Sequence, residues 1–152
     1  MPAAEPVILR LPFPPSVNGY WERASAFGKG GRRVPAMRIG KRGRQYRTAV
    51  MAAVNAEMFR RRLRGFVNDE RLRIDIVLSP PDRRRRDIDN YNKALWDALV
   101  HAGLFADDSQ IDEARITRGP VIKGGAAFIR LAEQDTPDVQ SWAQQLMESE
   151  HV

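Results

Sequence analysis

Apolar residues recur along this chain at two spacings, one typical of strands and the other of helices. Residues 7–11 and 71–78 alternate apolar with polar or charged side chains, and prolines follow both runs, so each is predicted to be a strand that ends abruptly. In residues 46–65 and 91–102 the apolar positions recur every three or four residues. This spacing predicts two amphipathic helices, the first of about four to six turns.

The rest of the chain divides into three segments. Residues 111–118 and 126–131 are strand-like and flank a proline and two glycines, as the strands of a hairpin would. Residues 139–146 suggest a short terminal helix that packs either on the sheet or on a partner. Residues 16–44 are rich in glycine, arginine and lysine with aromatics between them, so we expect an extended, mobile basic arm there.

The predicted order is strand, helix, strand, helix, strand, strand, helix, with no internal repeat. We therefore expect a fold that contains both helices and strands, α/β in the broad sense and α+β in class. It should be one small two-layer domain, with a mixed sheet of about four strands and helices packed on it. Residues 7–132 should form this domain, with a basic loop at 19–44. Residues 133–152 should form a C-terminal helical extension.

Composition narrows the chemistry. The chain contains no cysteine, which excludes disulfides, cysteine-bound zinc and a thiolate nucleophile. Oxygen ligands and a hard cation such as Mg²⁺ or Mn²⁺ remain as the expected metal chemistry. No apolar run is long enough to span a membrane, and the first residues lack a leader pattern, so we expect a soluble, cytoplasmic protein.

The chain is basic, with 25 Lys and Arg against 19 Asp and Glu and a net charge of +6. Arginine greatly outnumbers lysine, and its planar guanidinium suits phosphate because it donates two parallel hydrogen bonds. Charge alone puts nucleic-acid binding at about even odds.

One segment combines carboxylates with a run of arginines. Four arginines at 83–86 precede Asp87 and Asp89, and Lys93 follows four residues after Asp89. An extended chain would place both carboxylates on one side, and a helix that starts near Asp89 would place Lys93 and Asp97 on the same face.

This set matches the needs of phosphodiester hydrolysis: carboxylates for a cation, an activated water, and a positive group beside the phosphate. Asp108 follows the turn after the second helix, and a reversal there would bring its loop back beside that helix. The spacing does not fix whether this loop reaches Asp87.

Structural roles compete with each of these interpretations. The local pattern favours Asp87 or Asp89 as a helix N-cap over a metal ligand. Lys93 and Asp97 would also suit an ordinary exposed ion pair. The pair that contains Asp108 is, by itself, more often a polar loop than a metal site.

Taken together, several motifs closely resemble the RusA family of Holliday junction resolvases. They are LPFPPSVN at 11–18, PDRRRRDIDNYNK at 81–93, DAL at 97–99, AG at 102–103, DDSQI at 107–111 and KGG at 123–125. The resemblance spans about residues 7–132, and the compound pattern is far more specific than any one of its parts.

The resemblance implies that three aspartates bind Mg²⁺ or Mn²⁺ and that a lysine assists. By motif position these are Asp87, Asp89 and Asp108, with Lys93, and Asp107 is the adjacent alternative to Asp108. It also implies a homodimer that resolves four-way junctions by paired nicks in recombination and repair, in a family often found in phage or prophage genomes. One dimer would supply two equivalent sites.

For DNA contacts we expect a basic and polar set: Arg83, Arg84, Arg85, Arg86, Asn18, Lys41 and Arg44. Two features depart from the family. The glycine- and arginine-rich segment at 24–33 is longer than the usual loop, and the tail after Gln134 is an extension.

Three hypotheses follow. The leading one is a metal-dependent, structure-selective endodeoxyribonuclease. The second is a non-catalytic protein that binds branched DNA through its arginine run and basic arm. The third, a restriction-like nuclease suggested by Asp82 after Pro81, ranks low because that class needs a lysine on a strand, two residues after an acidic residue.

Overall fold

The computed structural model describes residues 5–62, 65–66, 69–134 and 139–150. The elements follow in the order β1 (Val7–Leu11), α1 (Val17–Tyr20), β2 (Trp21–Phe27), η1 (Lys29–Gly31), β3 (Arg33–Ile39), α2 (Lys41–Arg61), β4 (Leu72–Ser79), η2 (Ile88–Tyr91), α3 (Asn92–His101), η3 (Asp108–Gln110), β5 (Ile111–Arg118), β6 (Ala126–Glu133) and α4 (Ser141–Glu150), where η marks a 3₁₀ helix.

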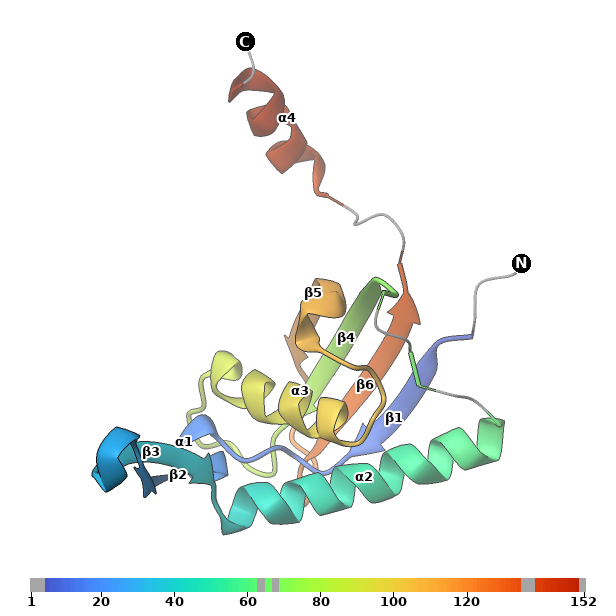
Figure 1. The fold of residues 1–152 in the computed structure, drawn as a ribbon. Helices are drawn as coiled ribbons and strands as arrows, with labels where there is room; N and C mark the ends of the chain where they lie inside the picture. Colours follow the sequence, from blue (N-terminus) through green and yellow to red (C-terminus); the bar gives the residue numbers. More distant parts are fainter. Residues whose placement is uncertain (1–4, 63–64, 67–68, 135–138, 151–152) are drawn as a thin grey trace.

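Four strands form a mixed sheet in the order β1-β6-β4-β5. The pairs β1–β6 and β4–β6 are antiparallel, and β4–β5 is parallel. Helices α2 and α3 lie together over one face of this sheet (Figure 1). The prediction of an α+β domain with a mixed four-stranded sheet is confirmed.

The core lies between the sheet and these two helices. On β4, Leu72, Ile74, Ile76 and Leu78 are buried, whereas the intervening residues are more exposed, as the period-two pattern predicted. Helix α3 contributes buried residues at helical spacing, including Leu95 and Leu99. Each such side chain stabilises the fold by about 1.5–3 kcal/mol, so the start of α3 is held against a rigid layer.

The predicted hairpin of residues 111–118 and 126–131 is wrong. The two segments are strands, but β6 lies between β1 and β4, while β5 pairs only with β4 among the described strands. The burial of the two strands explains the arrangement. Strand β6 buries most of its apolar side chains and takes an internal position, whereas the largely exposed β5 suits an edge.

The predicted extended arm at residues 16–44 is also wrong. This segment contains α1, a two-stranded hairpin of β2 and β3, and the first turn of α2. The hairpin shows no apolar alternation because it projects from the body and both of its faces meet solvent (Figure 1). Its strands pair from Trp21–Ile39 to Phe27–Arg33 around a glycine-rich turn.

Helix α2 begins five residues before the first apolar position that predicted it. In this first turn the buried residue is Gly43, which has no side chain to mark the apolar face. A Cβ on Gly43 would lie 2.5 Å from the Tyr20 carbonyl oxygen and 2.6 Å from Ile39 Cγ2. Gly43 therefore lets α2 approach the base of the hairpin closely.

Gly43→Ala should lower the free energy of unfolding by about 1–3 kcal/mol, because an added methyl overpacks this contact. In an exposed helix position the same change would stabilise by about 1 kcal/mol. Urea unfolding followed by circular dichroism measures the difference, with the exposed Gln45→Ala as control. A Gly43→Ala variant more stable than the wild type would contradict this packing.

The predicted terminal helix is present as α4. None of its residues is buried, and Figure 1 draws it away from the sheet, so packing on the sheet is not observed. No helix in the described part of the chain is long and apolar enough to cross a membrane.

Candidate active site

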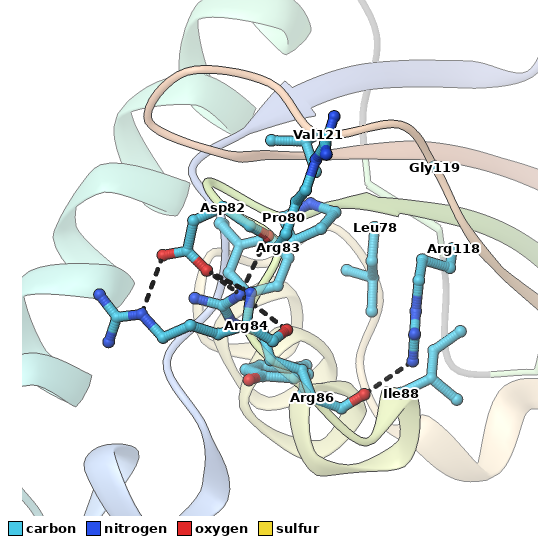
Figure 2. Close-up of a pocket in the computed structure, with 12 residues that line it drawn as sticks. Leu78, Pro80, Asp82, Arg83, Arg84, Arg86, Ile88, Arg118, Gly119 and Val121 are labelled. Atoms are coloured by element: carbon cyan, nitrogen blue, oxygen red, sulfur yellow. Dashed lines mark hydrogen bonds and ion pairs between the residues drawn. The ribbon is translucent and has the colours of Figure 1, made fainter.

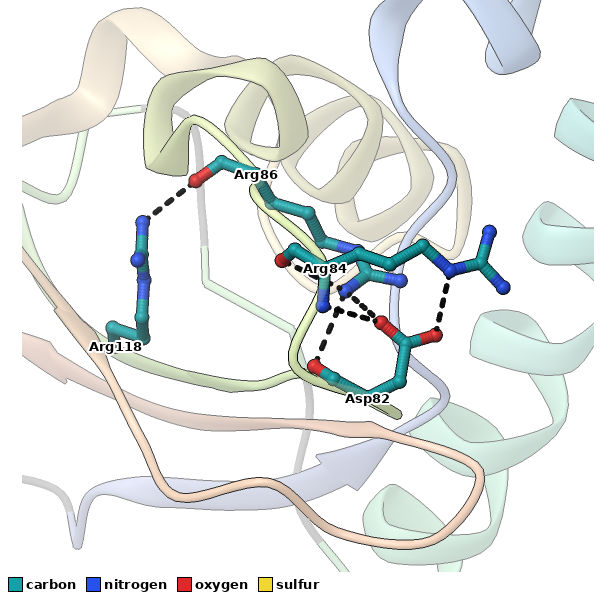
Figure 3. A network of polar contacts seen from close by, with 4 residues as sticks. All are labelled: Asp82, Arg84, Arg86 and Arg118. Carbon is teal, nitrogen blue, oxygen red and sulfur yellow. Dashed lines mark hydrogen bonds and ion pairs between the residues drawn. The ribbon is translucent and has the colours of Figure 1, made fainter.

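The arginine-rich loop after β4 is shaped by one carboxylate, Asp82 (Figure 3). Its Oδ1 accepts hydrogen bonds from the Arg84 backbone N–H at 2.9 Å and from Arg86 Nη1 at 2.6 Å. From the end of β5, Arg118 Nη2 donates to the Arg86 carbonyl oxygen at 2.7 Å. These bonds fix the path of the chain into Asp87.

The hydrogen bond from Arg86 is the main reason that the pKa of Asp82 falls from 3.8 to about 2. A lowered carboxyl pKa stabilises the folded form above the unfolded value, near 4, and the contribution is lost as the pH falls through about 2. The loop contacts therefore persist throughout the neutral range.

Beneath this loop lies a small pocket of about 150 Å³ (Figure 2). Arginines and aromatic side chains share its lining, among them Arg83, Arg118, Phe13 and Tyr91. The two rings pack at a centroid distance of 4.9 Å, and the Arg86 guanidinium lies 5.8 Å from the Phe13 ring centroid. Neither Phe13 nor Arg118 was predicted from the sequence to belong to the site.

The four arginines of the run have different roles. Arg86 is largely covered and bound to Asp82, and Arg84 Nε lies 3.3 Å from an Asp82 carboxylate oxygen. Arg83 and Arg85 are exposed, and among the described residues neither has an ion pair. These two guanidinium groups are free to bind phosphate.

Asp87 and Asp89 lie where the loop enters η2, and both are exposed. Asp87 precedes the first residue of η2, yet its side chain makes no capping hydrogen bond. The residue that precedes α3 is Tyr91, so Asp89 does not cap that helix. The N-cap alternative is therefore wrong, and both carboxylates project without a structural hydrogen bond in the described part of the chain.

Lys93, in the first turn of α3, is exposed beside a groove of about 630 Å³ that Asn18 and Trp21 also line. The structure thus brings the predicted DNA contact Asn18 to the predicted catalytic lysine. Asp97, one turn along, forms its ion pair with Arg47. The alternative of a Lys93–Asp97 pair is wrong.

The two neighbouring aspartates of the next loop differ in role. Asp107 caps η3: its Oδ1 accepts from the Ser109 N–H at 2.8 Å, and Gln110 completes a capping box. This hydrogen bond is the main cause of the lowered pKa of Asp107. Asp108 is exposed and its side chain does not form the cap, although its contact with Asp107 also lowers the pKa of that carboxyl. Asp107 is the carboxylate bound to a backbone N–H, so Asp108 is the better candidate for another ligand.

The structure does not gather the three predicted metal ligands. Within the described ranges, no group of three or more acidic or histidine residues is placed to hold a metal ion. Asp87 follows the loop that Arg118 holds at the end of β5, whereas Asp108 precedes the start of the same strand. Asp87 and Asp89 are two positions apart at the entry to η2, and among the described residues Asp108 forms no ligand group with them.

The remaining predicted DNA contacts, Lys41 and Arg44, lie in the first turn of α2 rather than on an arm. Both are exposed, and Arg44 Nη1 donates to the Ile39 carbonyl oxygen at 2.8 Å. Arg44 thereby ties α2 to the end of β3.

Comparison with known proteins identifies the family. The family model for Endodeoxyribonuclease RusA matches residues 12–131. The chain belongs to the RusA family. A crossover junction endodeoxyribonuclease of Enterobacteria phage HK97 is 36% identical over 126 residues, which cover 83% of this chain and 93% of the relative. Those of Enterobacteria phage 82 and Escherichia coli K12 are 34% and 35% identical over 125 residues, 82% of this chain and 92% of each relative.

The RusA match includes every residue predicted for catalysis, metal binding and DNA contact, and it ends before α4. It also includes a polar network that the sequence did not reveal. Tyr20 donates a short hydrogen bond to Asp97 Oδ2, and Arg47 contacts the same oxygen at 2.7 Å and the Tyr20 hydroxyl at 2.9 Å. These residues come from α1, α2 and α3, so the network holds the base of the hairpin against the helix that carries Lys93.

Burial of Tyr20 and its bond to Asp97 both raise the pKa of the phenol. The hydroxyl is therefore a stable donor at neutral pH, and loss of its acceptor leaves both Tyr20 and Arg47 with an unmet partner. Asp97→Ala should lower the free energy of unfolding by about 2 kcal/mol, and Tyr20→Phe by about 1 kcal/mol.

Urea denaturation tests both values, with the exposed Asp69→Ala expected to change stability by less than about 0.5 kcal/mol. If Asp97→Ala unfolds at the wild-type urea concentration, the network does not stabilise the RusA fold in this chain.

Proposed function

We propose that this chain is a metal-dependent endodeoxyribonuclease that resolves four-way DNA junctions in recombination and repair. The observation that carries the proposal is a pair of exposed carboxylates, Asp87 and Asp89, that serve no capping role beside exposed arginines and Lys93. The names of the RusA relatives, crossover junction endodeoxyribonucleases, support the same activity. We infer a cytoplasmic location because such DNA lies there in bacterial cells.

The carboxylates of Asp87 and Asp89 fit a hard divalent cation, Mg²⁺ or Mn²⁺, since both are oxygen donors without structural hydrogen bonds in the described residues. Asp108 has the same chemistry but lies apart from them, so its role as a third ligand rests on the family motif. When bound, the cation would neutralise charge on the phosphate in the transition state and activate a water.

The protein side chains position the DNA. Lys93 places a positive charge where the scissile phosphate would lie, next to Asn18 across the groove. Arg83 and Arg85, exposed on a loop that Asp82 holds in shape, would bind the flanking phosphates. A fixed loop binds with a lower ordering cost than a free arginine run.

Paired nicks require two sites, so we propose that the active form is a homodimer with one site in each chain. Sedimentation equilibrium of the free protein and of its junction complex tests this. Two chains per junction are expected, and a single chain that makes both cuts would contradict the dimer.

The activity is tested with a synthetic four-way junction and a linear duplex of the same sequence, each with Mg²⁺ or with EDTA. We expect cleavage of the junction in Mg²⁺ only and at least tenfold slower cleavage of the duplex. Equal cleavage of both substrates would overturn junction selectivity, and cleavage in EDTA would overturn the metal requirement.

A second candidate is a binder of branched DNA that does not cut it. The separation of Asp108 from Asp87 and Asp89 favours it, because an incomplete ligand set would bind metal weakly. Tight junction binding without cleavage, in both Mg²⁺ and Mn²⁺, would establish this second function in place of the first.

A further inference from the structure

The β2–β3 hairpin has two chemically different faces. Directly paired residues of an antiparallel ladder share a face, so the strand register assigns each residue to one side. One side, here called the Arg23 face, consists of Trp21, Arg23, Ser25, Phe27, Arg33, Pro35, Met37 and Ile39. It alternates basic side chains with large apolar ones.

The opposite side, the Glu22 face, is different in charge and size. It carries the Glu22–Arg38 ion pair, with 2.5 Å between Oε1 and Nε, and otherwise only alanines and Val34. Its two charges cancel, and it presents no side chain suited to a phosphate or a base. The two faces of one hairpin thus allow a matched comparison.

The Arg23 face continues from the proposed active site. The groove beside Lys93 is also lined by Trp21, Arg23 and Met37. A second hollow, of about 690 Å³, shares Arg23 and Met37 and extends to Arg33 near the hairpin turn; small side chains of the Glu22 face, Ala24, Val34 and Ala36, line it as well. The two hollows together form one path along the Arg23 face, from Lys93 towards the end of the hairpin.

The side chains along this path are unusually exposed for their type. Met37 is 60% exposed and Phe27 is 75% exposed, and the Arg33 guanidinium lies 5.6 Å from the Phe27 ring centroid. Exposed apolar groups beside basic ones fit a ligand that has both flat apolar surfaces and regularly spaced negative charges. Nucleic acid with accessible bases meets this description.

We propose that the Arg23 face binds the DNA strand that leaves the active site at the branch point, an inference that rests on the proposed function. Arg23 and Arg33 bind its phosphates, and Met37 and Phe27 contact bases that the junction leaves unstacked. In a linear duplex these base faces are covered by stacking. The hairpin therefore favours branched DNA over duplex.

A protein partner is the other class of ligand for an exposed apolar surface. Charge favours DNA: residues 21–39 contain five basic residues and one acidic residue, a net charge of 5 − 1 = +4. Continuity with the groove at Lys93 favours it too, since a strand bound at Lys93 has this path open beside it.

The first test compares two alterations on opposite faces of the hairpin in the full chain. Phe27→Ala with Met37→Ala should weaken binding to a four-way junction by about tenfold, because a base–side-chain stacking contact is worth about 1–3 kcal/mol. Binding to a linear duplex should change by less than about twofold. Ala26→Ser, at an exposed position of the Glu22 face that lines neither hollow, should leave both affinities within about twofold.

A 2-aminopurine placed at the branch point reports base unstacking directly. Its fluorescence should change on binding of the wild type and of Ala26→Ser, and much less on binding of the double variant. If the double variant binds and changes the fluorescence as the wild type does, or if Ala26→Ser is equally impaired, the assignment of the Arg23 face is overturned.

The second test uses charge and does not depend on the apolar side chains. Arg23→Gln should reduce the slope of log affinity against log salt by about one, as expected for one lost phosphate contact. Arg38→Gln, on the Glu22 face, should leave the slope unchanged. Equal slopes for Arg23→Gln and the wild type would contradict the phosphate contact. A wild type without preference for junctions would instead overturn the proposed function itself.

Discussion

Replacing Asp89 by asparagine should reduce junction cleavage by roughly a thousandfold, the upper range for loss of one charge-stabilising group in an active site. Asparagine keeps the shape of the side chain and one oxygen, but it lacks the negative charge that holds a divalent cation. Asp89 is exposed and carries no structural hydrogen bond in the described residues, so the fold should not change. Single-turnover cleavage at saturating protein measures the effect on the chemical step.

Junction affinity provides the control for this prediction. Binding in Ca²⁺ or without metal should stay within about twofold of wild type, because phosphate contacts come from basic side chains. Asp69→Asn, an exposed aspartate on the loop before β4, should cut normally. Wild-type cleavage rates for Asp89→Asn would show that the catalytic metal is not bound at the start of α3.

Asp108→Asn should lower cleavage by at least about a hundredfold, whereas Asp107→Asn should cut at a rate close to wild type. The reason is the division of roles at η3. Asp107 is occupied as the cap, and Asp108 is left with a carboxylate for the metal. Asparagine can also cap η3, so Asp107→Asn should change stability little, whereas Asp107→Ala should lower the free energy of unfolding by about 1 kcal/mol.

Asp107 and Asp108 are adjacent, so comparing their variants shows which of the two carboxylates is needed for cleavage. Cleavage rates should fall only for Asp108→Asn, and the urea midpoint should fall only for Asp107→Ala. Full activity in Asp108→Asn with loss in Asp107→Asn would shift the family motif by one residue. Full activity in both would remove this loop from the active site.

Most strands and helices of the domain could be predicted from the sequence. Each has one face on the core and one towards solvent, so its apolar residues recur at a regular spacing. Strand β4 shows this directly: Ile74 and Ile76 are buried, and their neighbours are not. The family motif predicts Asp87, Asp89 and Lys93 as site residues from a pattern that is local in sequence, and their roles in catalysis stay a prediction.

The hairpin could not be predicted in the same way, because only its base, at Trp21 and Ile39, packs against the core. Its register depends on backbone pairing around a glycine-rich turn, which leaves no apolar period. The order of the sheet was missed for another reason. Because β5 and β6 are adjacent in sequence, they were predicted to pair with each other. In the structure both pair with β4 instead, and β6 also pairs with β1.

Two contacts at the site differ in how well the sequence predicts them: the Tyr20–Asp97 hydrogen bond has no local sequence pattern, whereas the Asp107 cap has one. Tyr20 and Asp97 meet across 77 positions, so only the folded chain reveals their network with Arg47. The cap at Asp107 has a readable signal, since an aspartate three residues before Gln110 forms a capping box.

Cleavage of a cruciform in a supercoiled plasmid tests the central claim most directly, that this chain resolves four-way junctions by paired, metal-dependent nicks. Two nicks made within one binding event convert the plasmid to a linear molecule, whereas separate nicks release a relaxed circle. Linear product cut at the cruciform is expected in Mg²⁺, with none in EDTA. Relaxed circles as the lasting product, or an intact plasmid bound by the protein, would contradict it.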